Sequence, residues 1–265
     1  LHQHAQQYVQ KLDPNSAPVQ ALQAYLDGIN QFQAQGAQPV EFDLLGISPR
    51  PYSMEDTISI AGYLAYSFAA AFRTEPTLSY IRQELGADYL KIFDLSTPSA
   101  GALPEQAQLA LNNSDWTHLH SLAQLSQQAL FDAGLPQFEG SNAWVLDGSK
   151  TASGKPLLAG DPHISFSAPA VWYEAHLQAP GFELYGHFQA LNPFALLGHN
   201  QDFGWSITMF QNDDLDLIAL KKNPADPQQI WHNNQWHRLD SQTQWIAIKD
   251  QAPEQLILQH SPYGP

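Results

Sequence analysis

The tripeptide Gly140-Ser141-Asn142 combines the residue types that a self-cleaving chain needs. A serine hydroxyl that directly follows a scissile carbonyl can attack it and form an ester, which water then resolves. Glycine before the serine permits a strained backbone geometry that other residues resist. Cleavage would give Ser141 a free α-amine, whose reference pKa of about 7.7–8.0 lets it take the proton of the serine hydroxyl. One junction would then mark processing, nucleophile and base together.

Gly-Ser is also a common loop dipeptide, and taken alone it predicts nothing. Its place in the chain adds information, because the hydrophobic pattern changes there from helical spacing to short alternating runs. Helices followed by strands predict an α+β fold.

Four helical stretches are expected before Ser141. Apolar residues from Val19 to Phe32 recur at threes and fours, as on an amphipathic helix. Ser53, followed three residues later by Asp56, predicts a helix start. Pro76 is expected to open the third helix. The expected ranges are 19–32, 55–73, 76–85 with a continuation to 93, and 116–133.

After Ser141, short β-like runs alternate with turn residues. Asn233-Asn234 between apolar residues is typical of a hairpin turn. The expected strands are 144–146, 156–159, 170–177, 182–188, 195–197, 205–210, 215–220 and 245–248. These patterns divide the whole chain into three expected segments: a helical segment over 1–97, a spacer over 98–140, and a β-rich segment over 141–265.

Composition narrows the functional classes. The 265 residues carry a formal net charge of −15, which disfavours nucleic acid and anionic membrane surfaces. There is no cysteine, so neither disulfides nor thiolate metal sites are available. No apolar run reaches the ~18–20 residues of a membrane span, and no export signal is visible at the first residues. The histidines lack zinc-ligand spacing, and no Gly-x-Ser-x-Gly elbow, Walker loop or Rossmann fingerprint occurs.

Several segments, in the expected order, resemble the penicillin acylase family of N-terminal-nucleophile (Ntn) hydrolases. Before the junction these are Leu22-Gln-Ala-Tyr-Leu-Asp-Gly-Ile-Asn-Gln-Phe32, Glu41–Gly46 and Pro51–Asp56. After it they are Ser141–Leu146, Lys155–His163, Gly198-His-Asn200 and Trp205–Asp216. Each segment is weak alone, but the combination is specific. The resemblance implies an αββα-type sandwich of which this chain is a fragment.

The resemblance also implies roles for single residues. Ser141 would be the nucleophile and, through its α-amine, the base, after cleavage at Gly140-Ser141. The backbone N–H of Met209 would supply one oxyanion-hole donor, and the backbone of His163 would help to hold the free amine. The pocket positions Ile164, Leu197 and Ile207 are apolar, which favours an aliphatic or aromatic acyl group. Without the family motif, Met209 would be an ordinary strand residue and His163 a turn residue.

Calcium is implied in the same way. The resemblance places a structural Ca²⁺ on Asp213, the carbonyl of Leu215, and Asp216, with Glu75 as the glutamate from the first segment. Carboxylate and carbonyl oxygens are the ligands that Ca²⁺ prefers. Acidic residues this close together are otherwise typical of a solvated turn.

The sequence also departs from the family. The family's second oxyanion donor, an asparagine side chain, falls beyond residue 265, and Asn192-Pro193-Phe194 replaces a usual Pro-Gly step near the pocket wall. Additional segments are expected on both sides of this chain, so its partners should include the rest of its own precursor.

The sequence therefore predicts an amidohydrolase that cleaves an N-acyl bond through an acyl-enzyme. The resemblance suggests β-lactam side chains or acyl-homoserine lactones as substrates, and a periplasmic or extracellular location. The alternative is a non-catalytic, calcium-stabilised binding domain derived from the acylases.

Overall fold

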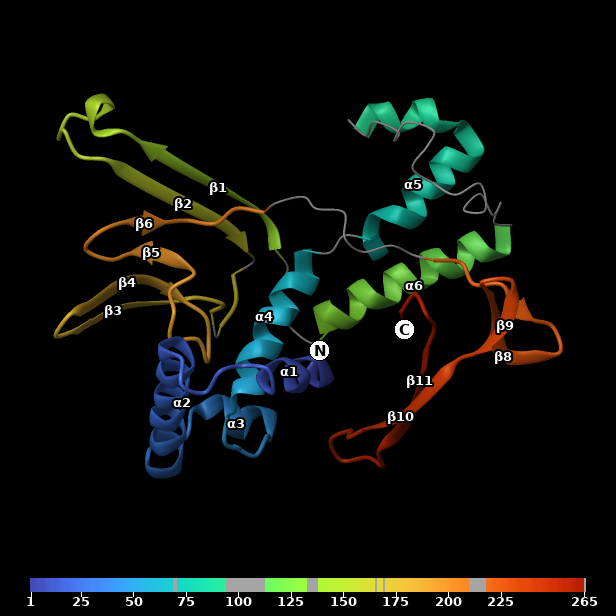
Figure 1. Ribbon diagram of the computed structural model, residues 1–265, viewed down its shortest axis with the longest axis horizontal. Coiled ribbons are helices and arrows are strands. Elements are labelled where there is room, and N and C mark those ends of the chain that lie inside the picture. Colours follow the sequence, from blue (N-terminus) through green and yellow to red (C-terminus); the bar gives the residue numbers. More distant parts are fainter. Residues whose placement is uncertain are drawn as a thin grey trace. The chain divides into compact units, whose positions relative to one another are not determined.

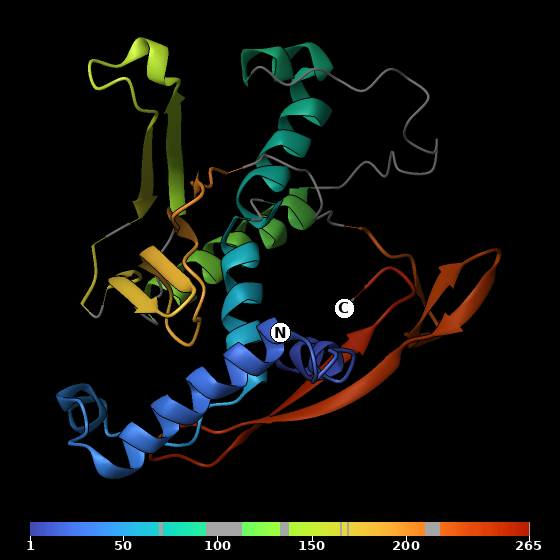
Figure 2. The same cartoon turned by 60° about the vertical axis from the view of Figure 1, so that its left-hand side comes forward.

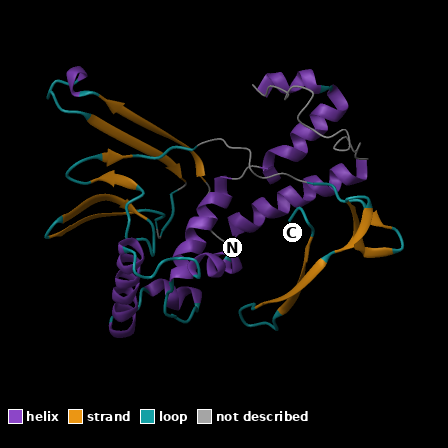
Figure 3. Cartoon of the chain, in the orientation of Figure 1, coloured by secondary structure: helices purple, strands orange, loops and turns teal. Residues whose placement is uncertain are grey.

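The computed structural model describes residues 1–68, 71–93, 113–132, 138–164, 166–168, 170–209 and 218–264. Helices occupy the first half and strands the second (Figure 3), so the expected α+β mixture is confirmed. The helices are α1 (His2–Val9), α2 (Ala17–Gln35), α3 (Val40–Leu45), α4 (Met54–Phe68), α5 (Ala71–Leu85) and α6 (Asn113–Asp132) (Figure 1). Short 3-10 turns follow at Ala87–Phe93 (η1) and Gly148–Lys150 (η3).

Two of these helices were not expected, and the expected start of a helix at Pro76 was wrong. Helices α1 and α3 lack a long apolar repeat, and both lie outside the helical ranges expected from the sequence. Pro76 was expected to open a helix, but it lies inside α5, which begins five residues earlier. Proline removes one helical hydrogen bond, so α5 lacks the bond that the residue 76 N–H would otherwise donate. The described part of the second expected helix extends to Phe68, residues 69–70 lie outside the described structure, and Arg73 lies in α5.

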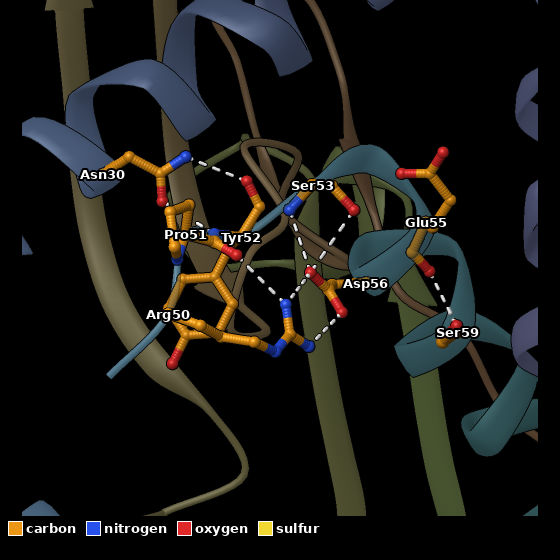
Figure 4. Close-up of polar contacts among 8 residues, drawn as sticks. All are labelled: Asn30, Arg50, Pro51, Tyr52, Ser53, Glu55, Asp56 and Ser59. Atoms are coloured by element: carbon orange, nitrogen blue, oxygen red, sulfur yellow. Dashed lines mark hydrogen bonds and ion pairs between the residues drawn. The ribbon is translucent and has the colours of Figure 1, made fainter. Parts of the chain in front are cut away.

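The N-terminus of α4 is held by a cluster of polar side chains (Figure 4). Asp56 accepts hydrogen bonds from the Ser53 backbone N–H at 2.9 Å and from Arg50 Nη2 at 2.6 Å. A carboxylate three residues into a helix that binds the preceding N–H forms half of a capping box. Asn30 of α2 bonds both the N–H (2.8 Å) and the carbonyl (2.9 Å) of Tyr52, which fixes this loop against α2. Ser53 therefore starts the helix where the sequence predicted.

The strands are β1 (Phe138–Leu146), β2 (Leu157–Ile164), β3 (Tyr173–Ala179), β4 (Phe182–Phe188), β5 (Leu197–His199), β6 (Gly204–Trp205), β7 (Lys222–Asn223), β8 (Asp226–His232), β9 (Gln235–Arg238), β10 (Asp240–Ile246) and β11 (Glu254–His260). All described pairings are antiparallel, in the orders β1-β2, β3-β4-β5-β6, β7-β8-β9 and β10-β11. Strands β7 and β11 were not expected. Of the expected strand over 215–220, residues 215–217 lie outside the described structure and 218–220 form no strand.

The chain divides into two compact units, residues 1–73 with 122–214 and residues 74–121 with 215–265. The first unit contains α1 to α4 and the strands β1 to β6. Its core in the four-stranded sheet is formed by Leu184, Phe188 and Ala195, against which Trp205 packs. The Trp205 indole N–H donates to the Ala195 carbonyl at 3.0 Å. Helix α2 reaches this sheet through the hydroxyls of Tyr25 and Tyr173, 2.5 Å apart.

Two glycines allow β4 and β5 to approach closely. Gly186 and Gly198 are directly opposite each other in the ladder. A Cβ on Gly186 would overlap the backbone carbonyl of Leu197, and one on Gly198 would overlap the carbonyl of Tyr185. Both overlaps are with backbone atoms, so no side-chain rotation could relieve them.

In the second unit, the hairpin of β8 and β9 turns at Asn233-Asn234. Both residues have positive φ, 48° and 63°, as a two-residue hairpin turn requires. The predicted turn is confirmed. Ile230 is fully buried here and Leu239 is nearly so. No helix in the described parts of the chain is long and apolar enough to cross a bilayer.

Candidate active site

Ser141 lies inside β1, not at the start of a strand. In the uncut chain β1 runs through the junction, with Gly140 opposite His163 and Ser141 opposite Pro162. Figure 2 shows β1 and β2, in yellow-green, as a two-stranded ribbon. Proline has no N–H, so Pro162 can donate no ladder hydrogen bond to β1 at this point. The strand therefore presents Ser141 in extended conformation, partly buried.

The side chain of Ser141 meets the backbone of Met209. The Met209 N–H donates a hydrogen bond to Ser141 Oγ at 3.0 Å, and the two residues are 68 positions apart in the sequence. Met209 follows β6, which is the edge strand next to β5 in the four-stranded sheet. The segment after β6 thus places a backbone N–H at the Ser141 hydroxyl oxygen. Two of the predicted site residues are therefore in contact.

The Ser141 hydroxyl proton has no acceptor among the side chains that the structure describes. Only the bond from Met209 involves Oγ, and there the oxygen accepts. A Ser-His-Asp arrangement would instead place an imidazole nitrogen at hydrogen-bonding distance from Oγ. The described residues around Ser141 Oγ therefore do not form a Ser-His-Asp arrangement.

A second polar group lies on the other face of the hairpin. His163 Nε2 is 2.9 Å from Asp161 Oδ2 and 3.3 Å from Asn142 Nδ2. Because side chains alternate along a strand, Asn142 faces away from Ser141, and His163 shares the face of Asn142. A carboxylate only accepts, so the Asp161 contact requires a proton on Nε2, and Asn142 Nδ2 then cannot donate to the same nitrogen. His163 therefore reaches the nucleophile only through its backbone, and its predicted role there stays a prediction.

Asn142 and Asp161 were not expected beside the His163 imidazole. The signal was present, because residues two apart in a strand share a face, and Asp161-Pro-His163 has that spacing. A histidine after a proline is more typical of a turn, whereas β2 continues through Pro162 and His163 to Ile164.

Gly140 does not show the strained conformation expected of it. It lies in β1 and is not among the glycines with positive φ. A Cβ there would approach His163 Nδ1 at 3.6 Å, an ordinary contact. In the uncut chain the junction is therefore extended, and nothing in its immediate surroundings excludes a larger residue.

The three apolar positions assigned to the pocket occupy different surroundings. Leu197 in β5 is 6% exposed, and Ile207 after β6 is 44% exposed. Ile164 ends β2 and is partly buried. Only Leu197 thus belongs to the packed interior.

The predicted calcium residues fall mostly outside the described structure. Asp213, Leu215 and Asp216 lie in 210–217, beyond the described residues, whereas Glu75 is in α5. Within the described ranges, no three His, Asp or Glu side chains are grouped so as to hold a metal ion. Calcium on these four residues stays a prediction.

Comparison with known proteins gives a match along the whole chain. The model of one protein family, described as penicillin amidase, matches residues 1–265.

Individual relatives are more distant. Penicillin acylase 2 proenzyme from Pseudomonas sp. (strain SE83) is 25% identical over 92% of this chain and 32% of its own length. Acyl-homoserine lactone acylase QuiP from Pseudomonas aeruginosa is 23% identical over 92% of this chain and 29% of its own length. Among solved structures, a thermostable penicillin G acylase from Alcaligenes faecalis is 26% identical, with a TM-score of 0.44, over 46% of this chain and 22% of that chain. The chain thus spans about a third of the length of the curated relatives it matches.

Proposed function

This chain belongs to the penicillin amidase family, and from this premise we propose that it is part of an acylase precursor that cleaves itself at Gly140-Ser141. The contact that carries the proposal is the hydrogen bond from the Met209 N–H to Ser141 Oγ at 3.0 Å. This hydrogen bond links Ser141, the expected nucleophile, to the Met209 amide, which is expected to stabilise the oxyanion.

Self-cleavage would begin with attack of Ser141 Oγ on the carbonyl carbon of Gly140. The Oγ–C bond forms as the hydroxyl proton leaves to solvent, and a tetrahedral oxyanion develops on the former carbonyl oxygen. This oxygen and Oγ are bonded to the same carbon, so a donor 3.0 Å from Oγ lies close to the new charge. The C–N bond then breaks, and the nitrogen takes up a proton. Water hydrolyses the resulting ester, leaving a Gly140 carboxylate and a free Ser141 amine.

The mature site would use the same atoms on an external amide. The new α-amine accepts the Ser141 hydroxyl proton, which explains why no described side chain needs to do so. Oγ attacks the acyl carbon, the amine of the substrate leaves with a proton, and water hydrolyses the acyl-serine ester. The Met209 N–H would serve both reactions, because each forms an oxyanion on the carbon that is bonded to Ser141 Oγ.

The rest of the precursor would complete this site. The penicillin acylase relative is described as a proenzyme, and this chain spans 32% of its length. In the β1-β2 ribbon, Trp144 is 63% exposed, Val145 74% and Leu157 54%. A two-stranded ribbon is at best marginally stable alone, so these side chains need a cover. We assign that cover to further strands of an Ntn-hydrolase sandwich, together with the second oxyanion donor.

The substrate would be an N-acyl amide with an apolar acyl group. The relatives are named for penicillin and for acyl-homoserine lactones, and the positions expected to line the pocket are Ile164, Leu197 and Ile207. None of these carries charge, so they would not compensate a charged acyl group. The proposal also includes a periplasmic or extracellular location. It further includes a structural Ca²⁺ bound by Glu75, Asp213, Leu215 and Asp216.

The decisive experiment is intact-mass analysis of the full-length protein, with sequencing of every N-terminus. We expect two chains, one of which begins at Ser141, and hydrolysis of either phenylacetyl amides or acyl-homoserine lactones. Ser141→Ala should give one uncut, inactive chain, whereas Ser141→Cys should keep a nucleophile and cleave. A wild type that stays in one chain, unchanged by Ser141→Ala, would instead establish the non-catalytic binding domain.

A further inference from the structure

One face of the β7-β8-β9 sheet carries a row of one lysine and two tryptophans (Figure 1 labels β8 and β9). Trp231 of β8 is directly opposite Trp236 of β9, and their ring centroids are 5.0 Å apart, edge to face. On the other side of Trp231 lies Lys221, whose carbonyl accepts from the Trp231 N–H at 2.8 Å. Lys221 Nζ lies over the Trp231 indole, 5.7 Å from its centroid, which is a cation–π contact.

A second, polar row runs beside the first. Arg238 of β9 is opposite Gln229 of β8, and Gln229 Oε1 accepts from Asn223 Nδ2 of β7 at 2.9 Å. Gln229 and Arg238 are each two residues from a tryptophan of the first row, so both rows share one face of the sheet. We call this set of six side chains the Trp face: Lys221, Asn223, Gln229, Trp231, Trp236 and Arg238.

The Trp face is the open side of its sheet. The opposite side is packed, and Ile230 is fully buried there. Trp231, in contrast, is 40% exposed and Trp236 is 38% exposed, and the side chains of Lys221 and Arg238 are also exposed. Tryptophan and arginine are enriched among the residues that contribute most to binding at interfaces. The composition of the Trp face is therefore that of an interaction surface.

The charge of the Trp face is opposite to that of the chain. The chain has 26 acidic residues and 11 Lys and Arg, a net charge of −15, but none of the six side chains is acidic. Neither Lys221 nor Arg238 forms an ion pair with a residue that the structure describes. Asp226 begins β8, but alternation places it with Ile230 on the packed side. The Trp face therefore attracts an anion that the net charge of the chain repels.

We propose that the Trp face binds an extended acidic peptide of a partner protein, in which two carboxylates flank one apolar side chain. Lys221 and Arg238 lie at opposite corners of the two rows, so two strand spacings and two residues separate their Cα atoms by about 12 Å. In an extended peptide, residues i and i+4 point to the same side and are about 13 Å apart. The pattern that fits is therefore acid-x-apolar-x-acid, with the central side chain against the two indoles.

Other anions fit the Trp face less well. A nucleic acid continues its charge beyond both cations, and the net charge of −15 repels that excess. An inorganic anion such as phosphate would meet a cation but would leave both indoles in water. Two carboxylates around one apolar group use both cations and both indoles.

The test titrates the full-length protein with blocked peptides of equal length. Glu-Ser-Leu-Ser-Glu carries the pattern, Gln-Ser-Leu-Ser-Gln removes the charge, and Glu-Ser-Ser-Ser-Glu removes the apolar group. Calorimetry should show that the first peptide binds and that the neutral one binds about tenfold more weakly, the effect of losing two exposed ion pairs. The peptide without leucine should also bind more weakly. Added salt should weaken the first peptide, because exposed ion pairs are screened.

Spectra and variants locate the binding. With ¹⁵N-labelled tryptophan, Glu-Ser-Leu-Ser-Glu should shift the indole N–H resonances of Trp231 and Trp236. Lys221→Gln and Arg238→Gln should each weaken this peptide about threefold and leave the neutral peptide unchanged. Lys150→Gln, at an exposed cation of η3, is the matched control and should bind as the wild type does. Trp236→Thr should remove the preference for leucine over serine at the centre of the peptide.

Three results would overturn the proposal. The first is equal affinity for the charged and the neutral peptide, and the second is no binding to the full-length protein, which would mean that another part of the precursor covers the Trp face. The third is a short oligothymidylate that displaces the peptide and binds more tightly. If Trp236→Thr does not fold, the indole shifts and the two cation variants still decide. None of these readouts depends on cleavage at Ser141, so their failure would leave the proposed acylase function untouched.

Discussion

The backbone N–H of Met209 donates a hydrogen bond to Ser141 Oγ at 3.0 Å, across 68 residues of sequence. The contact depends on the backbone of Met209 and not on its side chain. The hydrogen bond thus explains why a methionine can occupy a position that would contribute to catalysis.

Replacement of the Met209 peptide N–H by an ester oxygen should slow both self-cleavage and substrate hydrolysis. Loss of one oxyanion donor typically costs about 10²–10³ in rate. The matched control, Met209→Leu, keeps the N–H and should cleave at nearly the wild-type rate. Both rates can be followed by intact mass and by amine release. A Met209→Leu variant as slow as the ester would contradict a role for the backbone.

Asp161→Asn should have little effect, despite the proximity of Asp161 to the junction. Its contact with His163 is solvent-exposed, with side-chain exposures of 43% for His163 and 64% for Asp161. Exposed pairs of this kind contribute about 0–1 kcal/mol to stability. The pair also lies on the face opposite Ser141 Oγ, so cleavage should stay within about tenfold of the wild type. A hundredfold loss would show that His163 acts through its side chain.

Asp56 should make the first unit sensitive to acid. Hydrogen bonding by Arg50 lowers the pKa of Asp56 from 3.8 to about 2. A lowered pKa gives stability that is present above pH 4 and is lost as the pH falls from about 4 to about 2. Since Arg50 is largely exposed, we expect about 1–2 kcal/mol rather than the full linkage value.

The measurement for Asp56 compares thermal unfolding of the wild type and Asp56→Asn as a function of pH. The wild type should be more stable at pH 7, and the difference should shrink below pH 4. A difference that is the same at pH 7 and at pH 2 would exclude the Arg50 contact as its cause.

Glycine-to-alanine changes should have opposite effects in β4 and α2. Gly186→Ala places a Cβ against the Leu197 carbonyl and should destabilise the fold by at least about 2 kcal/mol. Gly28→Ala, in the middle of α2 with nothing within 4 Å, should stabilise it by about 0.5–1 kcal/mol. Urea unfolding of both variants tests the pair. Equal effects would contradict the close approach of β4 and β5.

Removal of calcium should lower the melting temperature of the full-length protein. EDTA should have this effect on the wild type, and added Ca²⁺ should reverse it, because a ligand that binds only the folded state stabilises it. Glu75→Gln should reduce the response to Ca²⁺. Identical melting curves with EDTA and with Ca²⁺ would remove Glu75 from the proposed site.

The amino-acid sequence by itself determined the local features of this protein. Apolar spacing located α2 and β4, Ser53 and Asp56 located the start of α4, and Asn233-Asn234 located a hairpin turn. These features depend on dihedral preference and on which face is apolar, and both are properties of neighbouring residues. The same locality made Pro76 misleading, since proline is typical of the first turn of a helix, whereas Pro76 lies inside α5.

Only the tertiary structure decided which distant groups meet. Ser141 with Met209, and Thr57 with Leu191, are contacts across 68 and 134 residues. Such contacts depend on strand register and helix packing summed over the chain. A shift of one residue along β1 would turn Ser141 to the other face of the hairpin. The sequence therefore predicted Ser141 as the nucleophile, whereas the pairing of β1 with β2 decided that Ser141 and the His163 imidazole lie on opposite faces.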